Sequence, residues 1–209
     1  MPMVAVNNYE ALGKGRYRVA FDNGVSCVLY RSEAAQLSIE AQCSLTDENY
    51  DYLINEIVGK RAKKRAMHIL EQMDRTEHQL REKLAKGEYP QECIDSAVEY
   101  VKKYRYLDDE RFASSYVRYH QEKLSRQQLS VKLSQKGVGR DIIAEALEME
   151  YEADDGEKIR NLLSKRHFDP DNTDRQENNK IYQYILRRGF KSSDILKEMR
   201  VFSENCTIC

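Results

Sequence analysis

The sequence predicts a mainly α-helical protein, built from three tandem three-helix repeats in an elongated, curved array and preceded by a small N-terminal β-hairpin element. Two observations lead to this fold class. Apolar residues alternate only before about residue 46, and beyond it their spacing is helical. In the helical part, a set of five apolar anchors with steps of 4, 5, 5 and 4 residues occurs three times. The sets are Leu80, Leu84, Tyr89, Ile94 and Val98; Leu129, Leu133, Val138, Ile143 and Leu147; and Ile181, Ile185, Phe190, Ile195 and Met199.

Residues 16–30 predict the hairpin. Apolar side chains alternate on both sides of the segment Asp22-Asn23-Gly24. Asn-Gly between such runs is typical of a type I′ turn, in which both central residues have positive φ. Thr46 then supplies a capping oxygen ahead of an apolar helical stripe, so we expect a helix to begin there.

Each anchor set predicts a helix, a turn and a second helix. The first two anchors are four residues apart, which places them on one face of a helix. We expect a glycine to end this helix in the left-handed conformation, and the basic residue before it to complement the negative end of the helix dipole. An acidic residue then marks the start of the next helix, whose buried stripe contains the last two anchors. The basic-glycine pairs are Lys86-Gly87, Lys136-Gly137 and Arg188-Gly189, and the acidic residues are Glu92, Asp141 and Asp194.

A further apolar stripe before each pair predicts a third helix per repeat, and the polar stretch Asp169–Asn179 predicts an enlarged loop in the third repeat. One repeat alone buries too little apolar surface to be stable, because ordering its backbone costs about 1–2 kcal/mol per residue. We therefore expect a hairpin-plus-helix extension over residues 1–57, repeats over 58–106, 107–152 and 153–202, and a flexible tail over 203–209.

The composition is polar: 33% of the 209 residues are charged, and the formal net charge is -1. Positive charge is concentrated in residues 58–140 between two acidic flanks, which favours contact with a polyanion or an acidic protein surface.

No apolar run approaches the roughly 20 residues that span a bilayer. Five cysteines at unrelated spacings, without a signal peptide, indicate reduced thiols in a cytoplasmic protein. Cys206 and Cys209 form a CxxC pattern but lack a second ligand pair, so we expect a frayed tail there.

The most distinctive local motif is Tyr106-Leu107-Asp108-Asp109-Glu110-Arg111-Phe112-Ala113, which joins the first repeat to the second. Asp108 or Asp109 is placed to cap the coming helix, and Phe112 begins its apolar face. Adjacent carboxylates are also potential cation ligands. The oxygen-ligand spacing of a calcium loop is missing, however, so capping is the better interpretation and we expect no metal.

This motif, followed by Leu133-Ser134-Gln135-Lys136-Gly137-Val138 and by Arg187-Arg188-Gly189-Phe190, resembles the signature of the RecX family, regulators of the bacterial recombinase RecA. The resemblance covers roughly residues 16–200, and the threefold helical repeat agrees with the three tandem three-helix units of that family. This chain departs from the pattern at Glu88, an additional residue between Gly87 and Tyr89. The structural signature residues are Tyr106, Leu107, Asp108, Asp109, Arg111, Phe112, Gly137 and Gly189.

The resemblance implies a non-enzymatic inhibitor of RecA without cofactor, which binds in the groove of the RecA filament on single-stranded DNA. In that family, binding reduces ATP hydrolysis, strand exchange and co-protease activity in recombination, DNA repair and the SOS response. We expect a monomer whose partners are the RecA filament and the single-stranded DNA within it. The residues themselves show neither a paired nucleophile nor a Gly-rich phosphate loop.

Two alternatives stay open. A helix-turn-helix-like transcription regulator would read duplex DNA with the helices around Gly137, although three equivalent copies favour a scaffold. A general helical adaptor would bind neither DNA nor RecA.

The candidate contact residues are cations, of which several lie in the basic run Gly59–Ala66. That run is either a solvated helix face or a surface that attracts phosphates or an acidic filament surface. Tyr100, Tyr104 and Tyr106 are able to stack on bases, but we expect them to pack against the next repeat. The predicted partner or DNA contacts are Lys60, Arg61, Lys63, Lys64, Arg118, Lys123, Arg126, Lys132 and Lys136.

Overall fold

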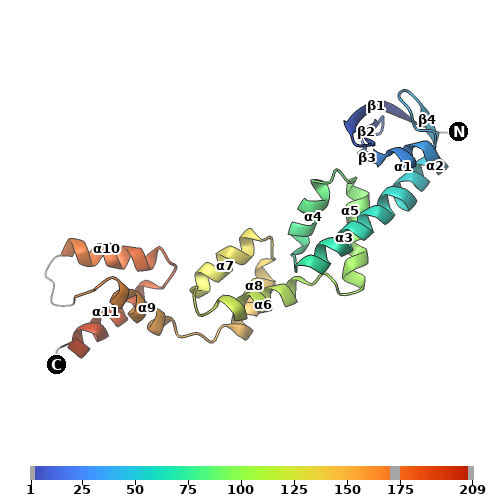
Figure 1. The fold of residues 1–209 in the computed structure, drawn as a ribbon. Helices are drawn as coiled ribbons and strands as arrows, with labels where there is room; N and C mark the ends of the chain where they lie inside the picture. Colours follow the sequence, from blue (N-terminus) through green and yellow to red (C-terminus); the bar gives the residue numbers. More distant parts are fainter. Residues whose placement is uncertain (1–2, 170–174, 207–209) are drawn as a thin grey trace. The chain divides into compact units, whose positions relative to one another are not determined.

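The structure is a computed structural model that describes residues 3–169 and 175–206, with side chains described as far as residue 201. The chain divides into two compact units that meet between Asp109 and Glu110. The elements are β1 (Met3–Gly13), β2 (Arg16–Phe21), β3 (Ser26–Tyr30), α1 (Arg31–Gln36), β4 (Ser44–Thr46), α2 (Asp47–Asp51), the π-helical segment η1 (Tyr52–Gly59), α3 (Lys60–Gln72), α4 (Glu77–Ala85), α5 (Gln91–Lys103), α6 (Asp109–His120), α7 (Arg126–Gln135), α8 (Arg140–Glu150), α9 (Asp155–Lys165), α10 (Arg175–Leu186) and α11 (Ser192–Cys206) (Figure 1).

The N-terminal element is a four-stranded antiparallel sheet with strand order β3-β2-β1-β4. The hairpin predicted over residues 16–30 is confirmed as β2 and β3, whereas β1 and β4 were not predicted. The pairing of β1 with β2 shifts register between Val6 and Asn8 and again between Ala11 and Gly13. These irregularities break the alternation of apolar and polar residues by which a strand is recognised in a sequence.

The hairpin turn differs from the type I′ turn predicted for it. Only Gly24 has a positive φ, of 83°. The Phe21 N–H donates to the Val25 carbonyl at 2.8 Å, and the Gly24 N–H donates to the Phe21 carbonyl at 3.1 Å. This pattern is typical of a three-residue loop with a left-handed residue at its end. Asn23 therefore needs no positive φ, and its Oδ1 accepts from the Val25 N–H at 3.1 Å.

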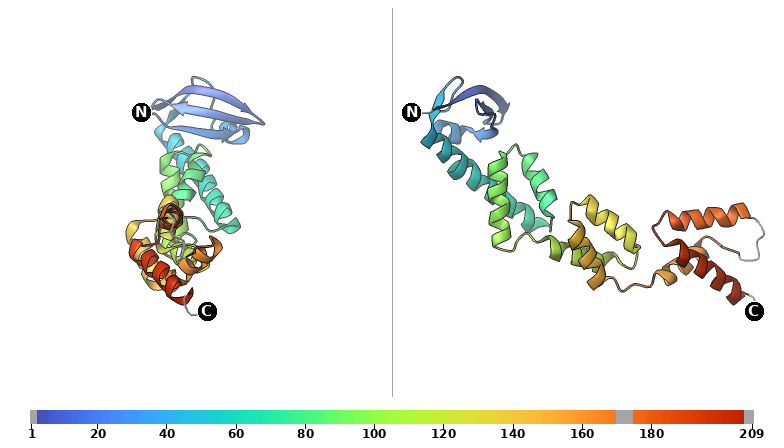
Figure 2. Two further views of the ribbon diagram at one scale, coloured as in Figure 1. Left: turned by 90° about the vertical axis from the view of Figure 1, so that its left-hand side faces the viewer. Right: turned by 180° about the vertical axis from the view of Figure 1, so that it is seen from behind.

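The helix predicted to begin after Thr46 is confirmed, since the Thr46 hydroxyl accepts from the Asn49 N–H at 3.3 Å. It continues through η1 into α3, so one unbroken helical segment leads from the sheet into the first repeat (Figure 2). The Ile54 carbonyl in η1 accepts from the Cys93 thiol at 3.3 Å, and a Cβ on Gly59 would lie 3.0 Å from the same carbonyl oxygen. The sheet and the first repeat accordingly share one hydrophobic core.

Two thiols lie inside that core and give a test of its packing. Burial raises the pKa of the Cys27 thiol to about 12 and that of the Cys93 thiol to about 11. Because the thiolate is the reactive form, we expect both to resist iodoacetamide at pH 8 in the native protein and to react in urea. Site-resolved mass spectrometry measures this, with the half-buried Cys43 as the reference. Native labelling of Cys27 or Cys93 as fast as that of Cys43 would contradict the prediction.

The three predicted repeats are confirmed as α3–α5, α6–α8 and α9–α11 (Figure 1). All anchors of the 4-5-5-4 spacing are buried except Tyr89 and Met199, which are partly buried. The second and third repeats each have a core of their own.

The loop predicted over Asp169–Asn179 is shorter than expected, because α10 already begins at Arg175; residues 170–174 lie outside the described part. Helix α11 reaches Cys206, so the flexible tail predicted over residues 203–209 is helical as far as Cys206, and residues 207–209 lie outside the described residues.

The glycine prediction is correct in two repeats and wrong in the first. Gly137 and Gly189 have φ values of 83° and 79°, but in the first repeat the left-handed residue is Glu88, with φ 57°. The Glu88 carboxylate accepts two hydrogen bonds from Arg18 of β2, at 2.6 and 2.8 Å, and this pairing lowers the pKa of the carboxyl group. The additional residue thus ends α4 and also connects the first repeat to the sheet. A Cβ on Gly87 would lie 3.0 Å from the Tyr89 ring.

Candidate partner interface

The joint after the first repeat explains part of the Tyr106–Ala113 motif. Asp109 Oδ1 accepts from the Glu77 N–H at 2.9 Å, at the start of α4, beside the buried capping residue Thr76. Burial raises the pKa of Asp109, although the hydrogen bond from the backbone favours its charged form. Asp109 is itself the first residue of α6. Its side chain therefore caps α4 of the preceding repeat and not the coming helix, which corrects one of the two alternatives predicted, Asp108 or Asp109.

A related joint lies between the second and third repeats, at Asp154 and Asp155. Asp154 caps α9 by accepting from the Gly156 N–H at 2.8 Å. Asp155 accepts from Tyr151 and from the Lys158 ammonium, at 3.2 Å in the second case. The sequence contains the signal for this joint, a second Asp-Asp pair at the start of a repeat, but we did not identify it there.

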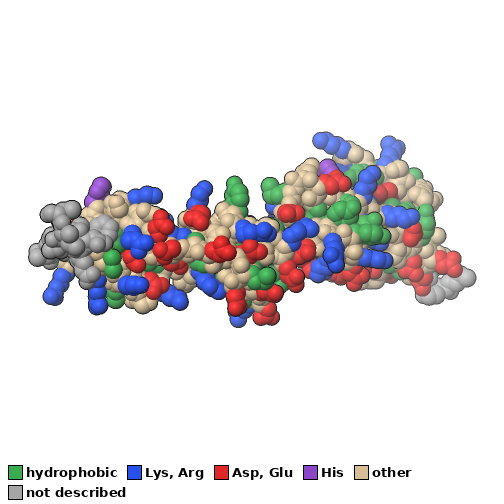
Figure 3. All heavy atoms as spheres, turned by 90° about the horizontal axis from the view of Figure 1, so that it is seen from below, with side chains coloured by type: hydrophobic (Ala, Val, Ile, Leu, Met, Phe, Trp, Pro, Cys, Tyr) green, Lys and Arg blue, Asp and Glu red, His purple; other side chains and the backbone are tan. Residues whose placement is uncertain are grey.

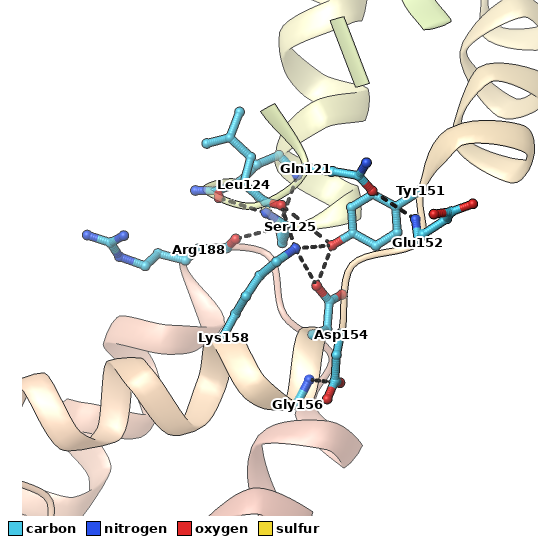
Figure 4. Close-up of polar contacts among 11 residues, drawn as sticks. Gln121, Leu124, Ser125, Tyr151, Glu152, Asp154, Gly156, Lys158 and Arg188 are labelled. Atoms are coloured by element: carbon cyan, nitrogen blue, oxygen red, sulfur yellow. Dashed lines mark hydrogen bonds and ion pairs between the residues drawn. The ribbon is translucent and has the colours of Figure 1, made fainter. Parts of the chain in front are cut away.

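Lys158 is the centre of this joint, and its side chain is only 12% exposed. Its ammonium donates to the Leu124 carbonyl at 3.1 Å and to the Tyr151 hydroxyl at 2.7 Å. Figure 4 shows Lys158 and Tyr151 pointing toward one another and toward Leu124, just before α7. Burial and the neighbouring Asp155 carboxylate raise the pKa of Tyr151, so its hydroxyl stays protonated as a donor.

The Arg188-Gly189 turn completes the joint from the third repeat. Ser125 caps α7 by accepting from the Gln128 N–H at 3.2 Å, and its hydroxyl donates to the Arg188 carbonyl at 2.7 Å (Figure 4). A Cβ on Gly189 would lie 3.0 Å from both the Gln127 Cβ and the Ser125 Oγ. Close approach and positive φ both require glycine at residue 189.

Within the basic run, we expected Arg61 to be exposed, but its side chain is only 20% exposed. Its guanidinium donates to Glu33 and to the Val28 carbonyl, each at 2.5 Å, and lies over the rings of Tyr30 and Tyr89. These partners fix α3 to the sheet and to the turn after α4. Arg61 therefore has a structural role in the folded chain.

The other cations of the run are on the surface, and they differ in their partners. Lys60 forms an ion pair with Glu56 at 2.7 Å, whereas the exposed Lys64 has no ion-pair partner among the described residues. Lys63 is half-buried, with its ammonium 5.8 Å from the centre of the Tyr100 ring on α5.

Tyr100 and Tyr104 lie beside this basic helix. Their ring centres are 4.9 Å apart, and the residues are 38% and 55% exposed. Tyr106 is 49% exposed. All three residues are thus exposed, and their packing against the next repeat stays a prediction. We call Lys63, Tyr100 and Tyr104 the α3–α5 face; the structure places a cation and two accessible rings together, although they are far apart in the sequence.

A second set of cations surrounds His120 at the end of α6. Burial and the nearby Lys123, Lys132 and Lys136 lower the pKa of His120, so the ring is mainly neutral at pH 7. Tyr116 and Tyr119 contact this ring, with centres 4.3 and 5.1 Å from it, and Tyr119 is 82% exposed. The Lys136 ammonium lies 5.3 Å from the Tyr116 ring centre. The α6–α7 cluster consists of Tyr116, Tyr119, His120, Lys123, Lys132 and Lys136.

Comparison with known proteins identifies these repeats. Family models described as the first, second and third three-helix domains of RecX match residues 62–100, 108–147 and 153–197. The chain belongs to the RecX family.

Curated relatives and solved structures agree with this membership. The regulatory protein RecX of Caldanaerobacter subterraneus subsp. tengcongensis is 30% identical over 188 residues, covering 89% of this chain and 93% of the relative. That of Serratia proteamaculans is 31% identical, covering 67% of this chain and 96% of the relative. A crystal structure of regulatory protein RecX has a TM-score of 0.61 with 23% identity, covering 91% of this chain and 96% of that chain. For RecX from Lactobacillus salivarius the TM-score is 0.60 with 21% identity, covering 70% and 97%. These two structures support the fold.

The remaining predicted contacts of this RecX-family chain are spread over its second repeat. Arg118 forms an ion pair with Glu150 at 3.1 Å, and Arg126 is exposed at the start of α7. On the face drawn in Figure 3, Lys and Arg side chains alternate with Asp and Glu side chains, so charge alone does not mark a contact surface. The combination of cations with accessible aromatic rings distinguishes the α3–α5 face and the α6–α7 cluster.

Other site types lack support in the part of the chain that the structure describes. There, no group of three or more His, Cys, Asp or Glu side chains is arranged to hold a metal ion. Within the same residues, no helix is both long enough and apolar enough to cross a membrane.

Proposed function

We propose that this RecX-family protein is a non-enzymatic modulator of RecA that binds along the groove of the RecA filament on single-stranded DNA. By occupying this groove it inhibits ATP hydrolysis, strand exchange and the co-protease activity of RecA. The match of all three repeats to RecX domains is the observation that carries the proposal. A row of similar units suits a helical filament, because successive repeats meet successive filament subunits and linked weak contacts raise the apparent affinity.

The two cation and tyrosine sites supply a physical basis for contact with DNA inside the filament. Lysines at both sites suit phosphates, and the exposed rings of Tyr100, Tyr104 and Tyr119 suit unpaired bases. The sites belong to different repeats, so each strengthens the attachment of the other through the chain that links them.

The deciding experiment is the RecA ATPase rate on single-stranded DNA, titrated with this protein at fixed salt. We expect a dose-dependent decrease. An unchanged rate, with the filament confirmed by light scattering and the added protein folded by circular dichroism, would contradict the proposal. A duplex binding assay at the same salt tests the transcription-regulator alternative, which requires preference for one sequence over unrelated duplex.

Charge reversal of Lys60, Lys63 and Lys64 to Glu is expected to weaken binding to the filament by roughly tenfold or more at low salt, because attraction to phosphates or acidic side chains becomes repulsion. Helical content should stay unchanged, since these side chains leave the core alanines of α3 in place. The measurement is filament co-sedimentation over a salt series. Reversal of the exposed Lys83 and Lys86 on α4 and its end is the matched control. If the triple variant and this control bound the filament with equal affinity, the basic run would be a solvated helix face that does not contact the filament.

Removal of the rings at Tyr100 and Tyr104 by alanine is expected to weaken filament binding by roughly 5- to 150-fold per stacked base, as for other base–aromatic contacts. Photo-crosslinking to 5-iododeoxyuridine in the filament strand should identify one of these tyrosines by mass spectrometry. Tyr52→Ala is the control, since Tyr52 is similarly exposed, at 44%, but lies on η1. If both alanine variants bind as tightly as Tyr52→Ala, stacking at this face is wrong.

A further inference from the structure

The second unit contains a groove of about 910 Å³ whose lining includes Arg126 but no residue of the α3–α5 face or the α6–α7 cluster. The neighbouring hollow described below shares only Lys132 with that cluster. Its walls come from α7, α8, the segment 151–155 and the turn that leads into α11. The buried anchors Ile143 and Leu147 form an apolar floor, together with the exposed Ala144. Val131, which is 49% exposed, lines this groove and also a neighbouring hollow of about 280 Å³. The two hollows therefore form one surface on either side of an accessible aliphatic side chain.

The charged residues of this surface are mostly unneutralised cations. Arg126, Arg140 and Lys191 line the larger hollow, and Lys132 and Arg187 line the smaller one. All five are exposed, and within the described residues none of them has an ion-pair partner. The groove also contains two carboxylates: Asp155 is neutralised by Lys158, and Asp194 accepts from the Ser193 hydroxyl. The surface is thus net positive around an apolar floor.

We propose that this groove docks a short acidic peptide segment of a partner protein, one that also carries aliphatic side chains. The aliphatic side chains would cover Val131 and the floor at Ile143 and Leu147, and the carboxylates would meet the surrounding Arg and Lys side chains. A nucleic acid strand matches the cations but not the apolar floor, because Ala, Val, Ile and Leu side chains offer neither donors for phosphate nor rings for bases. Charge and apolar surface together therefore favour a peptide.

The third repeat is needed to complete the site. Gly189 and Lys191 reach the groove because the Arg188-Gly189 turn docks on Ser125, at the start of α7. A peptide that spans this turn and α8 would hold the second and third repeats together.

The test is a selection of phage-displayed random 16-residue peptides on the full chain, without recombinase, so that its outcome is separate from the ATPase titration. We expect enriched peptides that combine Asp or Glu with Leu, Ile or Val. Val131→Glu and the pair Arg140→Glu with Lys191→Glu should each weaken their binding by roughly tenfold or more, measured by fluorescence anisotropy. Met149→Glu is the matched control, because Met149 lies on α8, is 68% exposed and does not line the groove.

Four results would overturn the proposal. One is that no peptide is enriched over an unrelated helical protein, and another is that the enriched peptides are neutral or basic. The third is that the acidic peptides bind the Val131→Glu variant as tightly as the Met149→Glu variant. The fourth is that a labelled oligo-dT strand binds the chain and binds the groove variants more weakly, while the affinity of the peptides for these variants is unchanged. That result would assign the groove to nucleic acid. Thermal unfolding of each variant verifies that it is folded, and the exposed position of Val131 makes Val131→Glu compatible with the native fold.

Discussion

Replacing Arg61 with alanine is expected to lower the free energy of unfolding of the first unit by about 1.5–3 kcal/mol, the range for hydrogen bonds to charged groups. The guanidinium is mostly buried and joins three parts of this unit: Glu33 in α1, the Val28 carbonyl in β3 and the Tyr89 ring after α4. Its removal leaves a half-buried carboxylate and a carbonyl without this donor. The effect should therefore exceed the loss of a surface ion pair.

Hydrogen exchange of peptides from β3, α1 and α3, together with urea unfolding followed by circular dichroism, measures this change. Arg65→Ala is the matched control, because Arg65 is exposed on the same helix, and its substitution should change stability by less than about 0.5 kcal/mol. Arg61→Lys should give an intermediate loss, since lysine keeps the charge but lacks the planar fork. If Arg61→Ala and Arg65→Ala had equal effects, the structural role of Arg61 would be wrong.

Replacing Gly189 with alanine is expected to loosen the third repeat from the second. The positive φ of 79° alone costs a residue with a Cβ about 1–2 kcal/mol. The added Cβ would also lie 3.0 Å from the Gln127 Cβ and from the Ser125 Oγ, so the turn has to move away from α7. This movement would break the 2.7 Å hydrogen bond from Ser125 to the Arg188 carbonyl.

The measurement is hydrogen exchange at the start of α7 and through α10 and α11, with the total loss of stability from urea unfolding. Gly24→Ala separates the cost of the positive φ from the cost of the close approach to α7. Gly24 has a φ of 83°, but nothing lies within 4 Å of an added Cβ there. We expect Gly189→Ala to be the more damaging of the two. Equal losses, with exchange in α7 unchanged, would show that close approach at the turn contributes nothing.

Much of the helical architecture follows from the sequence because helix periodicity is a local property. The 4-5-5-4 spacing identifies which side of each helix is buried, and the anchors lie where it predicts. Strand β1 was missed because its register shifts interrupt the alternating pattern, and its pairing with β4 joins segments distant in the chain. The left-handed role of Gly87 was predicted wrongly because the additional residue moves the left-handed position by one, to Glu88, whose carboxylate then pairs with Arg18.

By itself, the sequence determined the threefold repeat, the helical fold class and the resemblance to RecX, since all three depend on residue types at short spacings. Only the tertiary structure decided what the long charged side chains do. In the sequence Arg61 is one cation of a basic run, whereas in the structure it donates to Glu33, 28 residues away. Tyr100 belongs to the α3–α5 face because α5 packs beside α3. The hydrogen bond from the Ser125 hydroxyl to the backbone carbonyl of Arg188 likewise joins residues that are 63 positions apart in the sequence. The physical reason is that apolar burial follows helix periodicity, whereas the partner of a flexible polar side chain depends on which distant elements the fold brings next to it.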